Sequence, residues 1–146
     1  MPNPTPTGAL LDLARIALAA GREIMVVYAS DFATRTKTDL TPVTEADEAA
    51  ERIILADLAR HDPATPVISE EAASAGRIPA VEHRFYLVDP LDGTKEFINR
   101  NGEFTVNIGL ILEGLPAVGV VYAPALNRMF LGEVGSGAWQ ADIIPD

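Results

Sequence analysis

The sequence predicts an α+β fold, with two amino-terminal helices packed on a mainly antiparallel sheet. Two observations support this class. Apolar residues recur at helical spacing in the first part of the chain, and short apolar runs separated by turn residues follow in the second part. Helices that precede a sheet, instead of alternating with its strands, are typical of α+β proteins. A chain of 146 residues with 48% apolar residues is long enough to bury the core of one domain, residues 1–146.

The first helix is expected across residues 9–28, where one face carries regularly spaced apolar or small side chains. Residues 31–43 are polar and contain a proline near their end, so a loop or extended arm is expected there. The second helix is expected to begin at Thr44, because Thr44 and Asp47 fit the amino-terminal capping pattern. It is expected to end before Asp62-Pro63.

Short apolar runs in the rest of the chain predict six strands. They span residues 66–69, 85–88, 105–112, 117–122, 128–132 and 138–140. Sequential strands joined by short turns, such as Glu113-Gly114, favour antiparallel pairing. Residues 72–82 include Gly76 and Pro79 and predict a surface loop.

The composition narrows the function. The sequence has no cysteine, which excludes disulfides, thiolate zinc sites and cysteine nucleophiles and fits a reducing cytoplasm. A net charge of −10 repels the backbone of polymeric DNA or RNA, so neither is an expected partner. The same charge repels a phosphate ester, so a site for phosphate needs cations. Charged residues interrupt the apolar segment 9–28, and we expect no transmembrane segment. Peripheral attachment at the inner face of the cell membrane stays open.

Three carboxylates follow apolar runs. Glu70 comes after the predicted strand at 66–69, and Asp89 and Asp92 come after the predicted strand at 85–88. Carboxylate oxygens are the ligands that magnesium prefers, and two ions could clamp an attacking water and a leaving oxygen. Gly93 permits close approach of the backbone, and Thr94 is expected to open a turn or helix whose N–H groups point at an anion.

Other interpretations of the same residues stay open. Residues 89–94 could form a plain turn, Asp47 could only cap a helix, and Glu70-Glu71 could be a solvated pair. The basic residues Lys37, Lys95 and Arg100 could contact phosphate or simply be solvated. A haloacid-dehalogenase loop and an EF-hand both fail on the spacing of the acidic residues.

Three ordered motifs together resemble the inositol monophosphatase family. They are Asp89-Pro90-Leu91-Asp92-Gly93-Thr94, the stretch at 41–47 that ends in Asp47, and Ile68-Ser69-Glu70-Glu71. The run at 95–108 resembles the 3'(2'),5'-bisphosphate nucleotidase branch in particular. The resemblance implies the first half of that family's layered fold, and a phosphatase that converts adenosine 3',5'-bisphosphate to AMP in sulfur metabolism. An inositol monophosphatase-like activity, or a non-catalytic fragment that binds metal or phosphate, remains the alternative.

The resemblance also implies residue roles. Glu70, Asp89 and Asp92 match metal ligands, and Leu91 matches a ligand through its backbone carbonyl, so its side chain is expected to matter less. Thr94 and Asp47 match the pair that orients the attacking water. The matched substrate-binding positions are Glu70, Leu91, Asp92, Gly93 and Thr94. The cofactor implied is Mg²⁺, as two or three ions, with inhibition by lithium.

The chain departs from the family at its carboxyl-terminal side. The family has a second α/β portion with a Trp-Asp motif, whereas here Trp139 is followed by Gln140. We therefore expect a fragment that lacks a carboxyl-terminal domain, with an exposed edge or face of the sheet and a tendency to self-associate.

Overall fold

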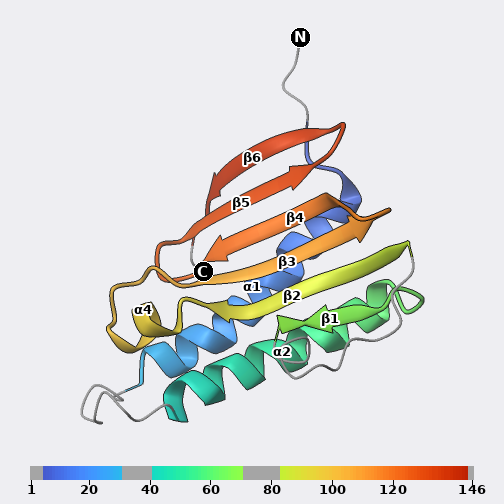
Figure 1. Cartoon of the computed structure of the whole chain (residues 1–146). Helices are drawn as coiled ribbons and strands as arrows, with labels where there is room; N and C mark the ends of the chain where they lie inside the picture. The colour runs from blue at the N-terminus through green and yellow to red at the C-terminus, as the bar shows by residue number, and fades with distance from the viewer. Residues whose placement is uncertain (1–4, 31–40, 71–82, 145–146) are drawn as a thin grey trace.

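The computed structural model describes residues 5–30, 41–70 and 83–144. Two long helices lie on one face of a six-stranded sheet (Figure 1). The elements in chain order are α1 (Gly8–Tyr28), α2 (Thr41–His61), β1 (Val67–Ser69), β2 (Arg84–Asp92), α4 (Thr94–Ile98), β3 (Thr105–Leu112), β4 (Leu115–Ala123), β5 (Arg128–Glu133) and β6 (Gly137–Asp142). This confirms the predicted fold class.

The sheet has the strand order β1-β2-β3-β4-β5-β6, so each strand pairs with its neighbours in sequence. The β1–β2 pair is parallel, and the other four pairs are antiparallel. Short turns join the strands from β3 onward, which is why antiparallel pairing could be predicted. The six strands fall where apolar runs predicted them.

The core lies between the two helices and the sheet. Apolar side chains of α1 and α2 pack against the inward residues of the central strands, among them Leu10, Ile24, Ile54, Val106, Ile108 and Val120, all at most 2% exposed. Gly21 lets α1 approach β4 closely, because a Cβ at this position would overlap the ring of Tyr122. The helix pair therefore fixes which face of the sheet is inward.

The predicted start of the second helix is wrong. The helix begins at Thr41, and not at Thr44. Pro42 is accommodated in the first turn because the first N–H groups of a helix have no intrahelical acceptor. Thr44 is an exposed residue inside the helix and not its cap, so Asp47 lies in the second turn. Helix capping therefore does not explain Asp47. Most of the predicted arm, at 31–40, lies outside the described residues, as does the predicted loop at 72–82.

Strand β2 is longer than predicted. It continues from Val88 through the Asp-Pro-Leu-Asp segment to Asp92, so the plain-turn interpretation of that segment is wrong. The parallel pairing with β1 reaches only to Ser69 opposite Val88. Pro90 lies beyond that point, so the missing N–H of the proline costs no ladder hydrogen bond to β1.

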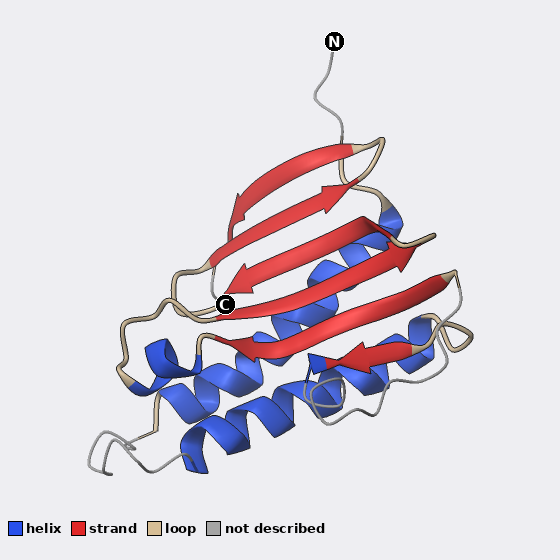
Figure 2. Ribbon diagram, in the orientation of Figure 1, coloured by secondary structure: helices blue, strands red, loops and turns tan. Residues whose placement is uncertain are grey.

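The second face of the sheet is open. Within residues 5–30, 41–70 and 83–144, both long helices lie on the same face, and none lies on the opposite one (Figure 2). Leu87, Val121 and Phe130 are 45%, 39% and 44% exposed on this face. A row of paired glycines, Gly109, Gly119 and Gly132, continues from Leu87 across the sheet. An exposed face of the sheet was expected from the sequence.

Neither long helix has the character of a membrane span. In the part of the chain that the structure describes, no helix combines the length and the apolar composition needed to cross a bilayer.

A polar cluster joins the end of α2 to the start of β2. Arg84 donates to Asp62 Oδ2 over 2.9 Å, and the Tyr86 hydroxyl donates to the same oxygen over 3.1 Å. Arg84 Nε also donates to Thr65 Oγ1 over 3.0 Å. Burial alone raises the pKa of Asp62, but hydrogen bonds from Arg84, Thr65 and Tyr86 outweigh it, so the pKa lies below its ordinary value.

We predict that Asp62→Asn destabilises the chain at neutral pH and much less in acid. Because the pKa of Asp62 is lower in the folded state than in the unfolded state, its contribution is complete above the unfolded pKa of about 3.9 and is lost as the pH falls through the folded pKa. Urea unfolding of both proteins at about pH 7 and about pH 3 measures this. Asp12→Asn, in an exposed pair with Arg15, is the control and should change little at either pH. An equal stability gap at both pH values contradicts the prediction.

Candidate metal and phosphate site

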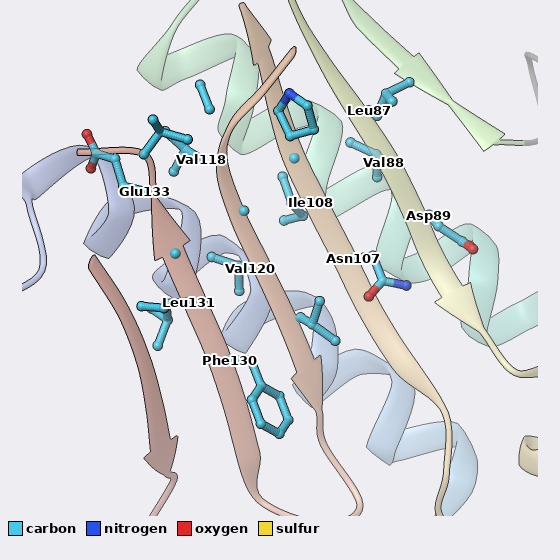
Figure 3. Close-up of a pocket in the computed structure, with 18 of the residues that line it drawn as sticks. Leu87, Val88, Asp89, Asn107, Ile108, Val118, Val120, Phe130, Leu131 and Glu133 are labelled. Atoms are coloured by element: carbon cyan, nitrogen blue, oxygen red, sulfur yellow. The ribbon is translucent and has the colours of Figure 1, made fainter. Parts of the chain in front are cut away.

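Glu70 and Asp89 lie on neighbouring segments, Glu70 directly after β1 and Asp89 within β2. β1 and β2 are parallel, and Ser69 pairs with Val88. Glu70 is the residue after Ser69 and Asp89 is the residue after Val88, so the two acidic residues lie next to each other. Both border a hollow on the open face, together with Asn107. Figure 3 shows the side chains of Asp89 and Asn107 projecting from β2 and β3 on the same side of the sheet. Glu70 is exposed and Asp89 is half-buried.

An extra residue in β2 brings the two aspartates onto one face. Asp89 pairs with Asn107, and Asp92 pairs with Thr105. Three steps along β2 therefore oppose two steps along β3, which defines a β-bulge. In a regular strand, residues three apart point to opposite faces. The bulge cancels that alternation, so Asp89 and Asp92 share a face.

Asn107 is a site residue that sequence reasoning did not single out. Its Nδ2 lies 3.5 Å from Asp92 Oδ2, a long hydrogen bond in which the amide donates, and it pairs across the sheet with Asp89. It therefore touches one aspartate and faces the other. The sequence does mark Asn107 as a polar residue between the apolar Val106 and Ile108 of β3. Its contact with Asp92, however, depends on the bulge, which the sequence pattern does not reveal.

Leu91 and Asp92 differ in environment. The Leu91 side chain is 3% exposed and belongs to the core, whereas Asp92 is exposed. The Leu91 side chain thus contributes to the fold, and the expectation that it matters less than the carbonyl for metal binding stays a prediction. Its backbone carbonyl as a ligand stays a prediction.

Gly93 ends β2 in a conformation that favours glycine. Its φ is 92° and its ψ is 50°, in the left-handed region. A Cβ there would lie 3.0 Å from the Glu103 carbonyl oxygen and 3.2 Å from Phe104 Cα, both backbone atoms. Thr94 is the first residue of α4 and is exposed, as the sequence predicted. The Phe97 N–H donates to the Gly93 carbonyl over 3.0 Å and closes the first turn.

Asp47 lies on α2, the helix that packs against both β2 and α4. Its Oδ1 is fully buried. Burial of a carboxylate oxygen is costly unless hydrogen bonds or a cation compensate it. Asp47 is thus a partly buried carboxylate of α2, and both its place at the site and its pairing with Thr94 stay predictions.

The acidic residues fit a hard cation by their chemistry. Carboxylates and a backbone carbonyl form the donor set that Mg²⁺ prefers. In the ranges 5–30, 41–70 and 83–144, no three acidic or histidine side chains converge closely enough to hold an ion. The structure thus brings Asp89 and Asp92 to one face and Glu70 to the adjoining strand end, without a closed coordination shell.

The basic candidates have different positions. Arg100 donates to backbone carbonyls of residues 28 and 30, so the interpretation of Arg100 as a merely solvated residue is wrong. Lys95 is exposed in α4, and Lys37 lies outside the described residues.

The chain belongs to the inositol monophosphatase family, whose sequence pattern it matches over residues 10–145. This confirms the resemblance found in the motifs. A 3'(2'),5'-bisphosphate nucleotidase CysQ of Salmonella typhimurium is 48% identical over 135 residues, which make up 91% of this chain and 54% of that protein. The chain spans about half the length of the curated relatives it matches.

Solved structures show the same fold. The crystal structure of CysQ from Bacteroides thetaiotaomicron superposes with a TM-score of 0.76 at 35% identity, covering 94% of this chain and 51% of that one. The extragenic suppressor protein suhB from Bartonella henselae gives a TM-score of 0.77 at 30% identity, covering 94% and 52%. The two helices and the six-stranded sheet are therefore a shared part of these larger proteins.

We predict that Gly93→Ala destabilises the chain by about 2–4 kcal/mol, because it adds backbone strain and a contact with the Glu103 carbonyl. Gly114→Ala is the matched control, since Gly114 has a φ of 79° but a Cβ added there would meet nothing within 4 Å. It should cost about 1 kcal/mol from strain alone. Chemical unfolding of both variants measures the difference, and equal losses would show that the contact with Glu103 contributes nothing.

Proposed function

We propose that this chain supplies the metal- and phosphate-binding part of a magnesium-dependent phosphatase. The proposed reaction is hydrolysis of the 3'-phosphate of adenosine 3',5'-bisphosphate to give AMP and phosphate, in sulfur assimilation and nucleotide recycling in the cytoplasm. The observation that carries the proposal is the bulge that places Asp89 and Asp92 on one face, next to Glu70 at the adjoining strand end. The names of the bisphosphate nucleotidase relatives support the choice of substrate.

Glu70, Asp89, Asp92 and the Leu91 carbonyl are proposed to hold two or three Mg²⁺ ions. When bound, the ions supply positive charge that offsets the phosphate ester and acidifies a water. Such charge is needed because the protein carries a net charge of −10 and would otherwise repel its substrate. Lithium inhibition belongs to the same proposal.

The other residues are proposed to position the reactants. Asp47 and Thr94 come from α2 and the start of α4, two elements in contact, and would hold the attacking water between them. Gly93 and Thr94 would contact the phosphate, because the backbone comes close at a residue without a Cβ. Positioning and charge stabilisation are the main requirements of phosphoryl transfer, and no covalent intermediate with the protein is needed.

Magnesium calorimetry and phosphate release test this proposal together. We predict that Asp89→Asn weakens Mg²⁺ binding by at least about 10-fold, since it removes a ligand charge at the centre of the site. Asp142→Asn, an exposed aspartate on β6, is the matched control and should bind Mg²⁺ as the unchanged chain does.

Each outcome of that experiment has a distinct meaning. Unchanged binding in Asp89→Asn would reject the site. Faster release of phosphate from inositol monophosphate than from adenosine 3',5'-bisphosphate would move the function to the inositol branch. Magnesium binding without release from either compound would favour the non-catalytic alternative.

We further propose that the open face lets two copies of this chain associate. Leu87, Val121 and Phe130 are exposed apolar residues on the open face of the sheet, and exposed apolar surfaces drive association in water. Light scattering over a concentration series should show a mass that rises toward the dimer. Phe130→Lys should reduce this association, whereas Leu115→Lys, at an exposed residue that begins β4, should leave it unchanged. A monomer at all concentrations contradicts the proposal.

A further inference from the structure

Arg100 links the end of α4 to the end of α1. Its Nη1 donates to the Tyr28 carbonyl over 3.0 Å, and its Nη2 donates to the Ser30 carbonyl over 2.6 Å. Tyr28 is the last residue of α1, and Ser30 lies just beyond it. The last carbonyls of a helix have no helical N–H group that donates to them, so a side chain can take that place. A guanidinium there also interacts favourably with the negative end of the helix dipole. The contact joins residues about 70 positions apart in the chain.

The same side chain rests on an aromatic cluster. The Arg100 Cζ lies 5.5 Å from the centroid of the Tyr28 ring, within range of a cation–π interaction. The Tyr28 ring packs on Phe97 and Phe104 at 5.3 Å and 4.9 Å between centroids. Both phenylalanines are fully buried. Phe97 belongs to α4, so the cluster connects Arg100 to the helix that begins at Thr94.

The backbone around Arg100 indicates why an anchor is needed. α4 has only five residues, and a helix of one turn is not stable by itself. Arg100 follows the helix with a φ of 56°, a left-handed conformation that usually falls to glycine or asparagine. An arginine at this position bears the conformational cost, and its hydrogen bonds to the last residue of α1 and to Ser30 just beyond it offset that cost.

The other end of α4 is the candidate phosphate turn. The Gly93 carbonyl accepts from Phe97 N–H over 3.0 Å, and the Lys95 carbonyl accepts from Asn99 N–H over 2.9 Å. Gly93 is also held against Glu103 and Phe104, on the segment that follows Arg100. A displacement of this segment would therefore move the Gly93–Thr94 turn.

We propose that Arg100 is a positioning residue that fixes the Gly93–Thr94 turn to the end of α1. It acts through the aromatic cluster and the α4 backbone, and its terminal nitrogens donate to the Tyr28 and Ser30 carbonyls at the end of α1. The part of this inference that concerns turnover rests on the proposed function, whereas the part that concerns the order of α4 does not.

Amide hydrogen exchange of the 146-residue chain tests the anchoring directly. In Arg100→Gln, the amides of Phe97 and Asn99 should exchange at least about 10-fold faster, because α4 opens more often without its anchor. Arg100→Lys should restore part of the protection, since an ammonium can donate to one of the two carbonyls. Arg15→Gln, an exposed arginine of α1, is the charge-matched control and should leave these amides unchanged.

Kinetics of phosphate release separate positioning from direct binding. Arg100→Gln should lower kcat by about 10-fold and change KM by less than about 3-fold, because a misplaced Thr94 affects the attacking water most. A rise in KM with unchanged exchange would instead make Arg100 a phosphate ligand and overturn the inference. Unchanged exchange in Arg100→Gln alone would also overturn it. If the parent chain neither binds Mg²⁺ nor releases phosphate, the proposed function fails, while the exchange data still decide whether Arg100 holds α4.

Discussion

The site depends on one extra residue in β2. Without the bulge between Asp89 and Asp92, the two carboxylates would point to opposite faces of the sheet, one of them toward the helices. The bulge is tolerated there because β1 ends at the level of Val88, and among the described residues β2 pairs only with β3 beyond that point. Because β1 is short, the segment from Asp89 to Asp92 can bulge without breaking hydrogen bonds to β1. Gly93 then turns the chain away from the sheet into α4.

Much of the architecture follows from local patterns. The run at 105–112 coincides with β3, and the first helix ends at Tyr28 as expected. The errors have two physical sources. Pro42 restricts the residue before it, but a helix can begin there because the first turn needs no N–H from proline. The Asp-Pro-Leu-Asp segment has turn composition, yet pairing with β3 keeps it extended. Tertiary context prevailed over local preference in both cases.

The candidate site was predictable in its residues but not in its geometry. Acidic residues after apolar runs identify Glu70, Asp89 and Asp92, and the motifs connect them to a phosphatase family that the chain proves to belong to. The face on which each carboxylate lies is set by the register between β2 and β3, which no single run of residues encodes. The partnership of Asn107 with the aspartates was missed for that reason, and so was the attachment of Arg100 to α1, since both join segments distant in the chain.

The glycine row on the open face has a consequence for how substitutions would be tolerated. Gly109, Gly119 and Gly132 have no left-handed φ, and a Cβ at each would meet its nearest atoms at 3.8–4.0 Å, an ordinary contact. In the described part of the chain, neither the backbone nor the packing demands glycine at these positions, although glycine weakens a strand. Larger side chains at these positions would leave this chain's own interior undisturbed. They would project from the open face and partly fill the hollow there, so the three glycines shape the surface of the sheet and not the packing of the core.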